Sequence, residues 1–530
     1  MTIDPAFVEA EFARQNNEPS AREHLREARA ARFADVAAAI RETVLDGELS
    51  AFDRRRRVLE IVRKALTAHG HFCRTADNRS FYFARFDRQL YDIEQQAFAH
   101  LLAWMSGLSP TENEFRFVHA MLAAEAARGD VVEVHNLAFF DPASGLLAIS
   151  DGGPGVWVRE RGGDWRRQLN GERGLLFFAE PDAAPWEPDF DAAPGALDWF
   201  LQQIPFADDG ALSAEDQRAA FLICVLGLFF PCFSRTVMIP AFVGPQGSGK
   251  TTAMRLTGRL LVGPQFDVMQ LRRDKEDAFV AAVTNRLVCG LDNVDARIAW
   301  LEDSLATLAT RQRYQLRRLY STNDLVSYAP RAFVMVSSRD PRFRRPDVAQ
   351  RLLIFRFRML NTFRDEPAIF ADLEKHRPAI WAAMLAMLAM TADKILDFEP
   401  PPMKFRMADF TAFGWRIFRA SGNQDAWTAL LARLESAQNE FAAEGDAVID
   451  VLRTLLERDG QIGPIETGEL FRLCRPLAED IGALTFPRTA TGFGRKLTGM
   501  ARIIEGELGA KFTEQRGHQG RRTIGITRRG

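Results

Sequence analysis

The sequence predicts a multidomain α/β protein, and three observations lead to this fold class. An apolar segment at residues 237–243 enters a glycine-rich loop that is followed by an amphipathic helix at 252–262, the order typical of an α/β core with a phosphate-binding loop. Short apolar strands at 71–75, 80–86, 131–141, 145–151, 155–160 and 175–180, with a turn at Asn78 and a helical segment at 96–128, predict an α+β domain before this core. A basic C-terminal region patterned as two helices and two strands predicts a winged-helix-like domain after it.

Length and composition agree with several domains. A chain of 530 residues exceeds the usual size of one domain, and its 47% apolar fraction is sufficient for packed cores. Boundaries are expected where the composition changes, as at the Pro/Asp/Ala-rich residues 181–194 and at the proline run 400–402. The predicted segments are an N-terminal helical segment (1–70), an α+β accessory domain (71–195), a helical linker (196–235), the core (236–395), a helical connector (396–445) and the basic domain (446–530).

Several classes of protein are disfavoured by composition. The net charge of −2 shows that any nucleic-acid footprint must be local. The cysteines are far apart in the sequence and favour small buried side chains over zinc or disulfides. The N-terminus lacks a secretory pattern, and the apolar residues 221–231 are too few to span a bilayer. We therefore expect a cytoplasmic protein without a membrane partner. The cysteines are Cys73, Cys224, Cys232, Cys289 and Cys474.

The glycine-rich loop fills every position of the pattern G-x-x-x-x-G-K-[ST], so the sequence predicts ATP and Mg²⁺ as cofactors. Glycines let backbone N–H groups turn toward phosphates, Lys250 reaches the β and γ oxygens, and the Thr251 hydroxyl ligates Mg²⁺. A chance glycine-rich turn is the alternative. The expected nucleotide-binding residues are Gly244, Pro245, Gln246, Gly247, Ser248, Gly249, Lys250, Thr251 and Thr252.

A second apolar strand ends in an acid at RLVCGLDNVD, residues 286–295. P-loop folds use such an acid to hold Mg²⁺, which makes Asp292 the expected second metal ligand. Asn293 follows it and can orient a water but cannot accept a proton, so the base is Asp295, Glu302 or another group. A third strand at 332–336 ends in two serines, 337 and 338, which bind the γ-phosphate or lytic water or only cap the chain.

Arginines cluster between this third strand and the next apolar segment. Ring-forming ATPases place there the arginine that reaches a neighbour's γ-phosphate, and Arg351 is the first candidate for that role. The alternative is that the cluster pairs with nearby acids such as Asp340 and Asp347. The cluster comprises Arg342, Arg344, Arg345 and Arg351.

The order of these motifs resembles the ATPase core of superfamily 3 helicases, in particular the AAA+-related primase-helicases of phages and plasmids. The similarity covers residues 235–360 and includes the Asp-Asn pair at 292–293, Arg-Leu-Tyr at 318–320 and Arg-Pro-Asp…Arg at 345–351. The resemblance implies an AAA+-like ATPase core in a ring, expected to be a hexamer, acting on DNA in the replication of a mobile element, with a primase or polymerase as a possible partner. His135-Asn136, the 140–152 hairpin and Asn170-Gly171 resemble the accessory domain that precedes such helicases.

In that family a β-hairpin before the third strand grips single-stranded DNA in the channel, and residues 314–328 match it. Arginines interleaved with Tyr314 and Tyr320 supply cations for phosphates and rings for bases. The alternative is that these arginines only make an edge hairpin soluble. The expected single-strand contacts are Arg311, Arg313, Arg317 and Arg318.

The C-terminal segment from residue 487 carries ten basic residues against three acidic ones. A recognition-type helix is expected at 487–504, and two strands around a glycine-rich turn are expected at 511–527, an order that lets helix and wing straddle duplex DNA. The alternative is a basic docking tail. The expected duplex contacts are Arg495, Lys496, Arg521 and Arg522.

The sequence thus predicts an ATP-dependent DNA helicase or translocase, with Lys250, Asp292, Asn293 and Arg351 as catalytic residues. Asn293 keeps a second class open, a nucleotide-switched DNA-binding assembly ATPase of defence or regulation that does not unwind DNA. A P-loop kinase fits less well, because the arginine-rich hairpin and the basic C-terminal domain have no role in it.

Overall fold

The protein is described by a computed structural model that covers residues 33–180, 183–208, 212–272, 275–294, 298, 300–317, 325–339, 345–403, 405–444, 446–481, 486–516 and 522–528. The chain forms two compact units. Unit 1 comprises Met1–Pro194, Arg259–Phe266 and Glu374–Ala392, and unit 2 comprises Gly195–Gly258, Asp267–Leu373 and Asp393–Gly530.

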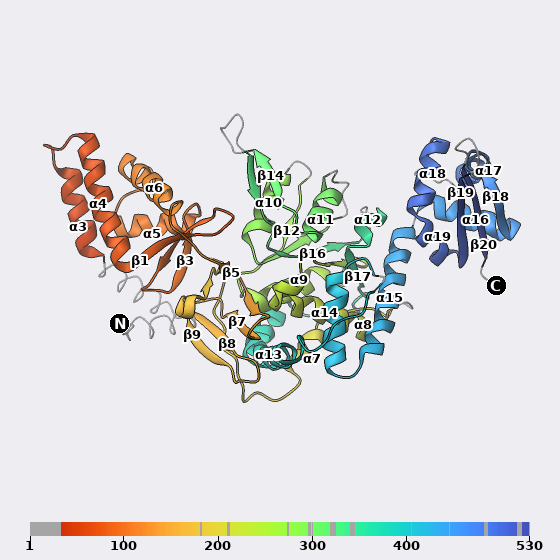
Figure 1. Ribbon diagram of the computed structural model, residues 1–530, viewed down its shortest axis with the longest axis horizontal. Coiled ribbons are helices and arrows are strands. Elements are labelled where there is room, and N and C mark those ends of the chain that lie inside the picture. Colours follow the sequence, from red (N-terminus) through yellow and green to blue (C-terminus); the bar gives the residue numbers. More distant parts are fainter. Residues whose placement is uncertain are drawn as a thin grey trace. The chain divides into compact units, whose positions relative to one another are not determined.

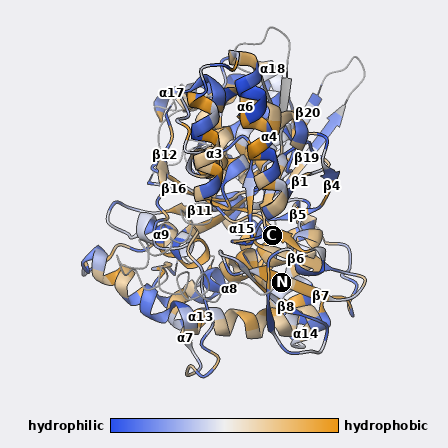
Figure 2. Cartoon of the chain, turned by 90° about the vertical axis from the view of Figure 1, so that its left-hand side faces the viewer, coloured by the Kyte–Doolittle hydropathy of each residue, from blue (hydrophilic) through white to orange (hydrophobic). Residues whose placement is uncertain are grey.

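Unit 1 begins with a four-stranded sheet of order β3-β2-β1-β4. The helices that precede and follow its strands in the sequence share one apolar core. Helices α4 and α6 carry both hydrophilic and hydrophobic residues, as helices that pack one side on a core must (Figure 2). The helix expected between residues 96 and 128 is two helices, because Gly107 ends the first with a left-handed φ of 72°. The elements are α3 (Ala34–Leu45), α4 (Ala51–His69), β1 (Gly70–Arg74), β2 (Ser80–Ala84), β3 (Gln89–Asp92), α5 (Gln96–Ser106), α6 (Asn113–Ala126) and β4 (Asp130–Val131).

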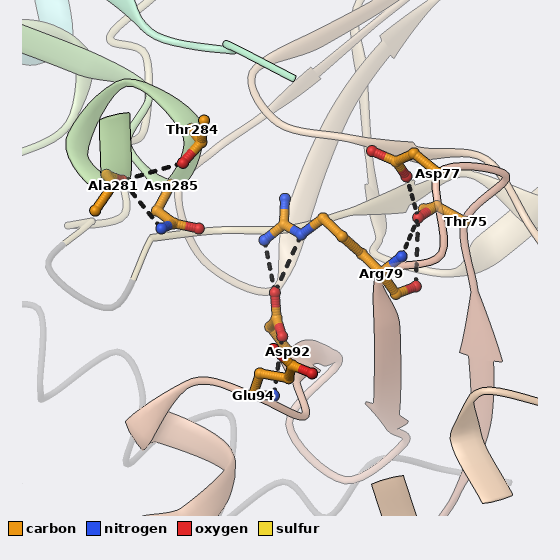
Figure 3. Close-up of polar contacts among 8 residues, drawn as sticks. All are labelled: Thr75, Asp77, Arg79, Asp92, Glu94, Ala281, Thr284 and Asn285. Atoms are coloured by element: carbon orange, nitrogen blue, oxygen red, sulfur yellow. Dashed lines mark hydrogen bonds and ion pairs between the residues drawn. The ribbon is translucent and has the colours of Figure 1, made fainter. Parts of the chain in front are cut away.

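Polar contacts at one end of this sheet fix the turn between β1 and β2. The Arg79 guanidinium lies 2.7 Å from Asp92 at the end of β3, and the Thr75 hydroxyl donates to Asp77 (Figure 3). Asn78, where the sequence predicted the turn, has a positive φ of 65°, a conformation that asparagine tolerates better than most residues.

A second antiparallel sheet of order β6-β7-β8-β9 completes the strands of unit 1, together with the parallel pair β5 and β10. The single strand expected at 131–141 is divided among β4, β5 and β6, while the strands expected at 145–151, 155–160 and 175–180 are confirmed as β7, β8 and the short β10. The bounds are β5 (Val134–His135), β6 (Ala138–Asp141), β7 (Leu146–Ser150), β8 (Gly155–Arg159), β9 (Arg166–Leu169) and β10 (Leu176–Phe177).

Unit 1 also takes up two segments that the sequence analysis assigned to the core at 236–395. Buried Arg377 and Trp381 both donate hydrogen bonds of 3.2 Å to the carbonyl of Leu260. The Trp381 ring stacks on Trp186, with ring centroids 3.7 Å apart. These contacts join 259–266 and 374–392 to the residues that precede position 194.

Unit 2 is built on a five-stranded sheet of order β12-β13-β16-β11-β17, in which every pairing is parallel. Figure 1 labels β12, β16 and β17 of this sheet. All residues of β11, β13 and β16 are buried, which explains their nearly continuous apolar sequences. The three strands expected from the sequence are confirmed. The elements are β11 (Ile239–Val243), α9 (Lys250–Leu261), β12 (Met269–Gln270), α10 (Glu276–Asn285), β13 (Val288–Asp292), α11 (Leu301–Ala309), β16 (Phe333–Ser338), α12 (Pro346–Ala349) and β17 (Leu352–Arg356).

Helices and a hairpin complete this part of unit 2. The apolar segment 221–231 is buried in the end of α8 and the 3-10 turns after it, and no helix among the described residues is long and apolar enough to cross a membrane. The hairpin expected at 314–328 is confirmed as two antiparallel strands. The elements are α7 (Ala196–Gln202), α8 (Ala214–Leu226), η2 (Gly227–Phe229), η3 (Pro231–Phe233), β14 (Tyr314–Arg317), β15 (Leu325–Tyr328), α13 (Glu366–Lys394), α14 (Ala408–Ala420) and α15 (Gln424–Ala443).

The described C-terminal part of unit 2 combines four helices with a three-stranded antiparallel sheet of order β18-β20-β19. The single helix expected at 487–504 is two helices that meet at Met500. Four cysteines are buried as expected, whereas Cys232 is exposed. The elements are α16 (Ala447–Asp459), β18 (Gln461–Glu466), α17 (Thr467–Asp480), α18 (Ala490–Gly499), α19 (Ala501–Glu507), β19 (Ala510–Arg516) and β20 (Arg522–Arg528).

A close helix contact predicts a measurable stability effect. A Cβ at Gly414 of α14 would overlap the ring of Trp427, which is fully buried and donates a 2.9 Å hydrogen bond to the carbonyl of Thr411. Gly414→Ala should therefore lower the free energy of unfolding by about 1–3 kcal/mol. Gly468→Ala in α17 is the control, because its Cβ would meet no atom within 4 Å. Denaturant unfolding measures both, and equal stability of the two variants would contradict the prediction.

Candidate phosphate-binding site

The parallel pairing of β11, β13 and β16 places the ends of these strands at one edge of the sheet. Val243 pairs with Ser338, and Leu291 pairs with Val336, so the residues that follow the strands share this edge. The carboxyl edge of a parallel sheet is where α/β proteins bind ligands. The glycine-rich loop, residues 244–249, leaves β11 there and leads into α9, which begins at Lys250.

The loop has the backbone that its glycines allow. Gly247 and Gly249 have φ angles of 77° and 80°, a region that residues with a Cβ rarely adopt. A Cβ at Gly244 would lie 2.6 Å from the carbonyl oxygen of Phe357. The Lys250 ammonium donates to the carbonyls of Gly244 and Pro245, each at 2.8 Å, and to the Ser248 hydroxyl at 3.2 Å. Lysine and loop are therefore held together at the N-terminus of α9, a position that favours anions.

The expected metal ligands are in contact. The Thr251 hydroxyl donates a 2.9 Å hydrogen bond to Asp292 Oδ1, and the Ser337 hydroxyl donates to the same oxygen. Asp292 is only 8% exposed and Ser337 is fully buried. A threonine hydroxyl beside a buried carboxylate provides the hard oxygen ligands that Mg²⁺ prefers, which fits the cofactor predicted from the sequence.

Asn293 is held beside this carboxylate. Its backbone N–H donates to the Ser337 hydroxyl at 3.1 Å, and its side-chain amide donates to Asp292 Oδ2 at 3.4 Å. The residue is exposed and has a positive φ of 54°, which asparagine tolerates. Ser337 thus fixes both Asp292 and the backbone of Asn293, so the structure supports a positioning role for this serine over simple capping.

A pocket of about 700 Å³ opens over the loop. Its polar wall includes Asn293 and the arginines Arg339 and Arg358, which follow β16 and β17. Sequence reasoning missed both arginines. Arg358 is exposed and has no side-chain hydrogen bond or ion pair within the described residues, so its charge is available to an anion in the pocket. The signal that could have found it is its place two residues after an apolar strand, but only the sheet order puts that strand beside β11.

Of the two candidate bases named from the sequence, only Glu302 is among the described residues. Asp295 lies outside the described residues. Glu302, near the start of α11, is half-buried, and this burial raises its pKa despite the opposing backbone hydrogen bond and charge of Arg345. Its carboxylate accepts from the Arg345 backbone N–H at 3.3 Å. Glu302 therefore contacts the arginine cluster, and no described contact joins it to Asp292.

The two described arginines of the cluster, Arg345 and Arg351, differ in their contacts and position. Arg345 forms ion pairs of 2.7 Å with Asp303 and 2.8 Å with Asp347, so for this residue the pairing alternative is confirmed. Arg351 precedes β17, and Leu352 pairs with Ile239 at the start of β11. Because strands rise about 3.3 Å per residue, Arg351 lies roughly 15 Å from the loop edge of its own sheet. Burial and nearby Arg406 lower the pKa of Arg351. Arg342 and Arg344 are outside the described residues.

Only some of the residues expected to contact DNA are exposed. Arg311 is not exposed: its Nε is buried without a hydrogen bond, and burial lowers its pKa. It follows α11 with a left-handed φ of 49°. Arg313 and Arg495 are exposed, whereas Lys496 pairs with Asp446 at 2.7 Å and Arg522 with Glu514 at 3.3 Å. Arg318, Arg521 and the side chain of Arg317 lie outside the described parts of the chain.

Comparison with known protein families gives one match, and it spans this site. Residues 209–439 match the family described as actinomycete integrative conjugative element replication protein. The matched segment contains the glycine-rich loop, Asp292, Ser337 and Arg351. No curated protein sequence matches the chain.

Solved structures similar to the chain include helicases at low identity. The A form apo structure of the NrS-1 C-terminal region is 12% identical, covers 88% of this chain and 99% of its own, and has a TM-score of 0.37. The structure titled SCCmec type IV Cch, active helicase, is 10% identical and covers 87% and 93%, with a TM-score of 0.43. The X-ray structure of JCV helicase is 14% identical and covers 46% and 70%, with a TM-score of 0.21. These TM-scores are too low to establish a shared overall arrangement.

Proposed function

We propose that this protein is an ATP-dependent DNA helicase or translocase that acts in the replication of a mobile element as an oligomeric ring. One observation carries the proposal: the loop lysine, the Thr251 hydroxyl and the Asp292 carboxylate meet at the carboxyl edge of a parallel sheet. This donor set binds a Mg²⁺–nucleoside triphosphate and few other ligands. The replication family matched by residues 209–439 supports the choice of DNA as the second substrate.

The residues of the site would share the work of hydrolysis. Lys250 and the loop N–H groups would bind the β and γ phosphates, and Thr251 and Asp292 would hold Mg²⁺, whose charge would neutralise the phosphate oxygens. Asn293, exposed beside Asp292, would orient the attacking water by hydrogen bonding. Glu302 is the described candidate base, and its pKa, raised by burial, would make it a better proton acceptor than an ordinary carboxylate.

The position of Arg351 supports the proposal of a ring. Since Arg351 lies at the opposite end of β17 from the loop, it cannot serve the site of its own chain. A neighbouring subunit could receive it, and its charge would then be present only in the assembled ring, which is proposed to be a hexamer. Arg345 is less suited to this role, because two carboxylates already neutralise it.

DNA would contact two places in the chain. The hairpin β14–β15, preceded by exposed Arg313, would meet a single strand in the channel. The order α16, β18, α17, α18, α19, β19, β20 with the sheet order β18-β20-β19 is similar to a winged helix, and exposed Arg495 on α18 would meet duplex DNA.

A second function is favoured by Asn293 alone. A glutamate at this position would polarise water, whereas the Asn293 amide donates to Asp292 and cannot accept a proton. A nucleotide-switched assembly ATPase that binds DNA without unwinding it would need no efficient base. Strand displacement with ATP separates the two functions, because only a helicase releases the displaced strand.

The nucleotide assignment predicts opposite defects for two variants. Lys250→Ala should abolish productive ATP binding, because it removes the cation that reaches the phosphates. Asp292→Ala should keep much of the nucleotide affinity but remove Mg²⁺-dependent turnover. ATP hydrolysis measured with and without single-stranded DNA tests the function, and stimulation by DNA is expected for the wild type. Normal hydrolysis by Asp292→Ala would show that the Mg²⁺ assignment is wrong.

The shared site predicts rescue between two inactive proteins. Arg351→Ala should bind nucleotide and turn it over slowly, and mixing it with Lys250→Ala should restore part of the activity. Rescue arises at interfaces that combine an intact loop with an intact arginine. Arg345→Ala is the control and should show no such rescue with Lys250→Ala. No rescue by Arg351→Ala at any mixing ratio would place that arginine in a structural role.

The duplex contact predicts a specific change in salt dependence. Arg495→Gln should reduce the slope of log affinity for duplex DNA against log salt by roughly 0.9, because one phosphate contact is lost. Lys496→Gln on the same helix should change the slope less, since Asp446 already neutralises Lys496. Single-strand stimulation of hydrolysis should persist in both variants. Equal slopes for both variants on duplex DNA would argue against α18 as the duplex contact.

A further inference from the structure

The pocket over the glycine-rich loop extends beyond the space that phosphates need. Its lining includes Asn293 and Arg339, the residues after α7, and residues between β17 and the first turn of α13. Thr252 and Leu256 of α9 line it as well. Besides the loop, the same pocket therefore offers side chains that can meet the sugar and base of a nucleotide.

Two apolar side chains form walls of this pocket. Pro205 lies 3.2 Å from the Cβ position of Gly249, and the Phe363 ring lies 3.4 Å from that of Gly247. Phe363 is 70% exposed, which is unusual for so large an apolar side chain. A flat, exposed aromatic ring at a pocket wall provides a stacking surface for a nucleobase, and stacking accepts any base.

One polar side chain of the pocket has a fixed orientation. Gln203 lines the pocket, and its Nε2 donates a 3.2 Å hydrogen bond to the carbonyl of Trp199. A carbonyl can only accept, so the nitrogen must face Trp199, and this contact settles which atom of the amide is the acceptor Oε1. Neighbouring Gln202 also lines the pocket but is exposed, and among the described residues its amide has no hydrogen bond. Only Gln203 therefore presents a defined acceptor.

We propose that Gln203 Oε1 selects an adenine base, with Phe363 as its stacking surface, in the pocket beside the glycine-rich loop. This inference rests on the proposed nucleotide binding. Adenine carries an amino group at C6 that donates to an acceptor, whereas guanine carries an oxygen there that is repelled by one. The apolar walls do not distinguish the two purines, so the preference depends on the anchored glutamine.

Competition of unlabelled ATP and GTP against a fluorescent ADP analogue tests the proposal on the full chain. The wild type should prefer ATP by about tenfold or more, as one good hydrogen bond is worth about that factor. Gln203→Leu should remove most of this preference, and Gln203→Lys, which presents a donor, should favour GTP. Gln202→Leu is the matched control and should keep the wild-type ratio. Phe363→Ala should weaken ATP and GTP by the same factor.

The outcomes distinguish a failure of the proposed role of Gln203 from a failure of the proposed nucleotide binding. ATP binding without preference over GTP in the wild type, or an unchanged preference in both Gln203 variants, would overturn the role of Gln203 and leave nucleotide binding intact. Absence of binding by either nucleotide would overturn the proposed function itself. Thermal unfolding of each variant identifies loss of folding, and the Gln203→Lys reversal cannot arise from loss of folding, because an unfolded protein prefers neither nucleotide.

Discussion

The candidate site depends on the parallel register of three buried strands. Because β11, β13 and β16 run in the same direction and pair without a shift, the loop after the first strand, the aspartate ending the second and the serine near the end of the third share one edge. A displacement of β16 by one residue would reverse the faces of Ser337 and its neighbours. Asp292 would then lose the donor that orients it. The chemistry of the site is thus a consequence of the apolar sequences that bury these strands.

The sequence predicted much of this core, because its signals are local. The loop spacing, the apolar strands and the acid after the second strand need no knowledge of distant contacts. Arg358 and Gln203 could not be predicted in this way. Arg358 reaches the pocket because β17 pairs with β11, and Gln203 reaches it because the chain after α7 passes the loop. Sheet order and chain return are non-local, so no local pattern shows them.

The differences between expectation and structure have separate physical causes. A left-handed glycine divided the helix expected at 96–128, since Gly107 ends α5 where the apolar periodicity continues. Arg311 belongs to an arginine-rich stretch, yet the Nε atom of its guanidinium is buried. Arg345 and Arg351 look equivalent in the sequence, but the acids at 303 and 347 surround only the first. Charge in a sequence therefore indicates a surface function only after its partners are known.

The contacts of Lys250 make ligand binding an exchange. Its ammonium already has two carbonyls and a hydroxyl as acceptors, so a phosphate must replace bonds that exist, as well as form new ones. The existing bonds join a cation to neutral oxygens, whereas a phosphate oxygen adds the attraction of an opposite charge, which favours the replacement. A neutral ligand of the same shape would gain nothing from it. The loop thus discriminates by charge before any group of the pocket is engaged, and the same internal bonds keep the lysine from attracting weaker anions.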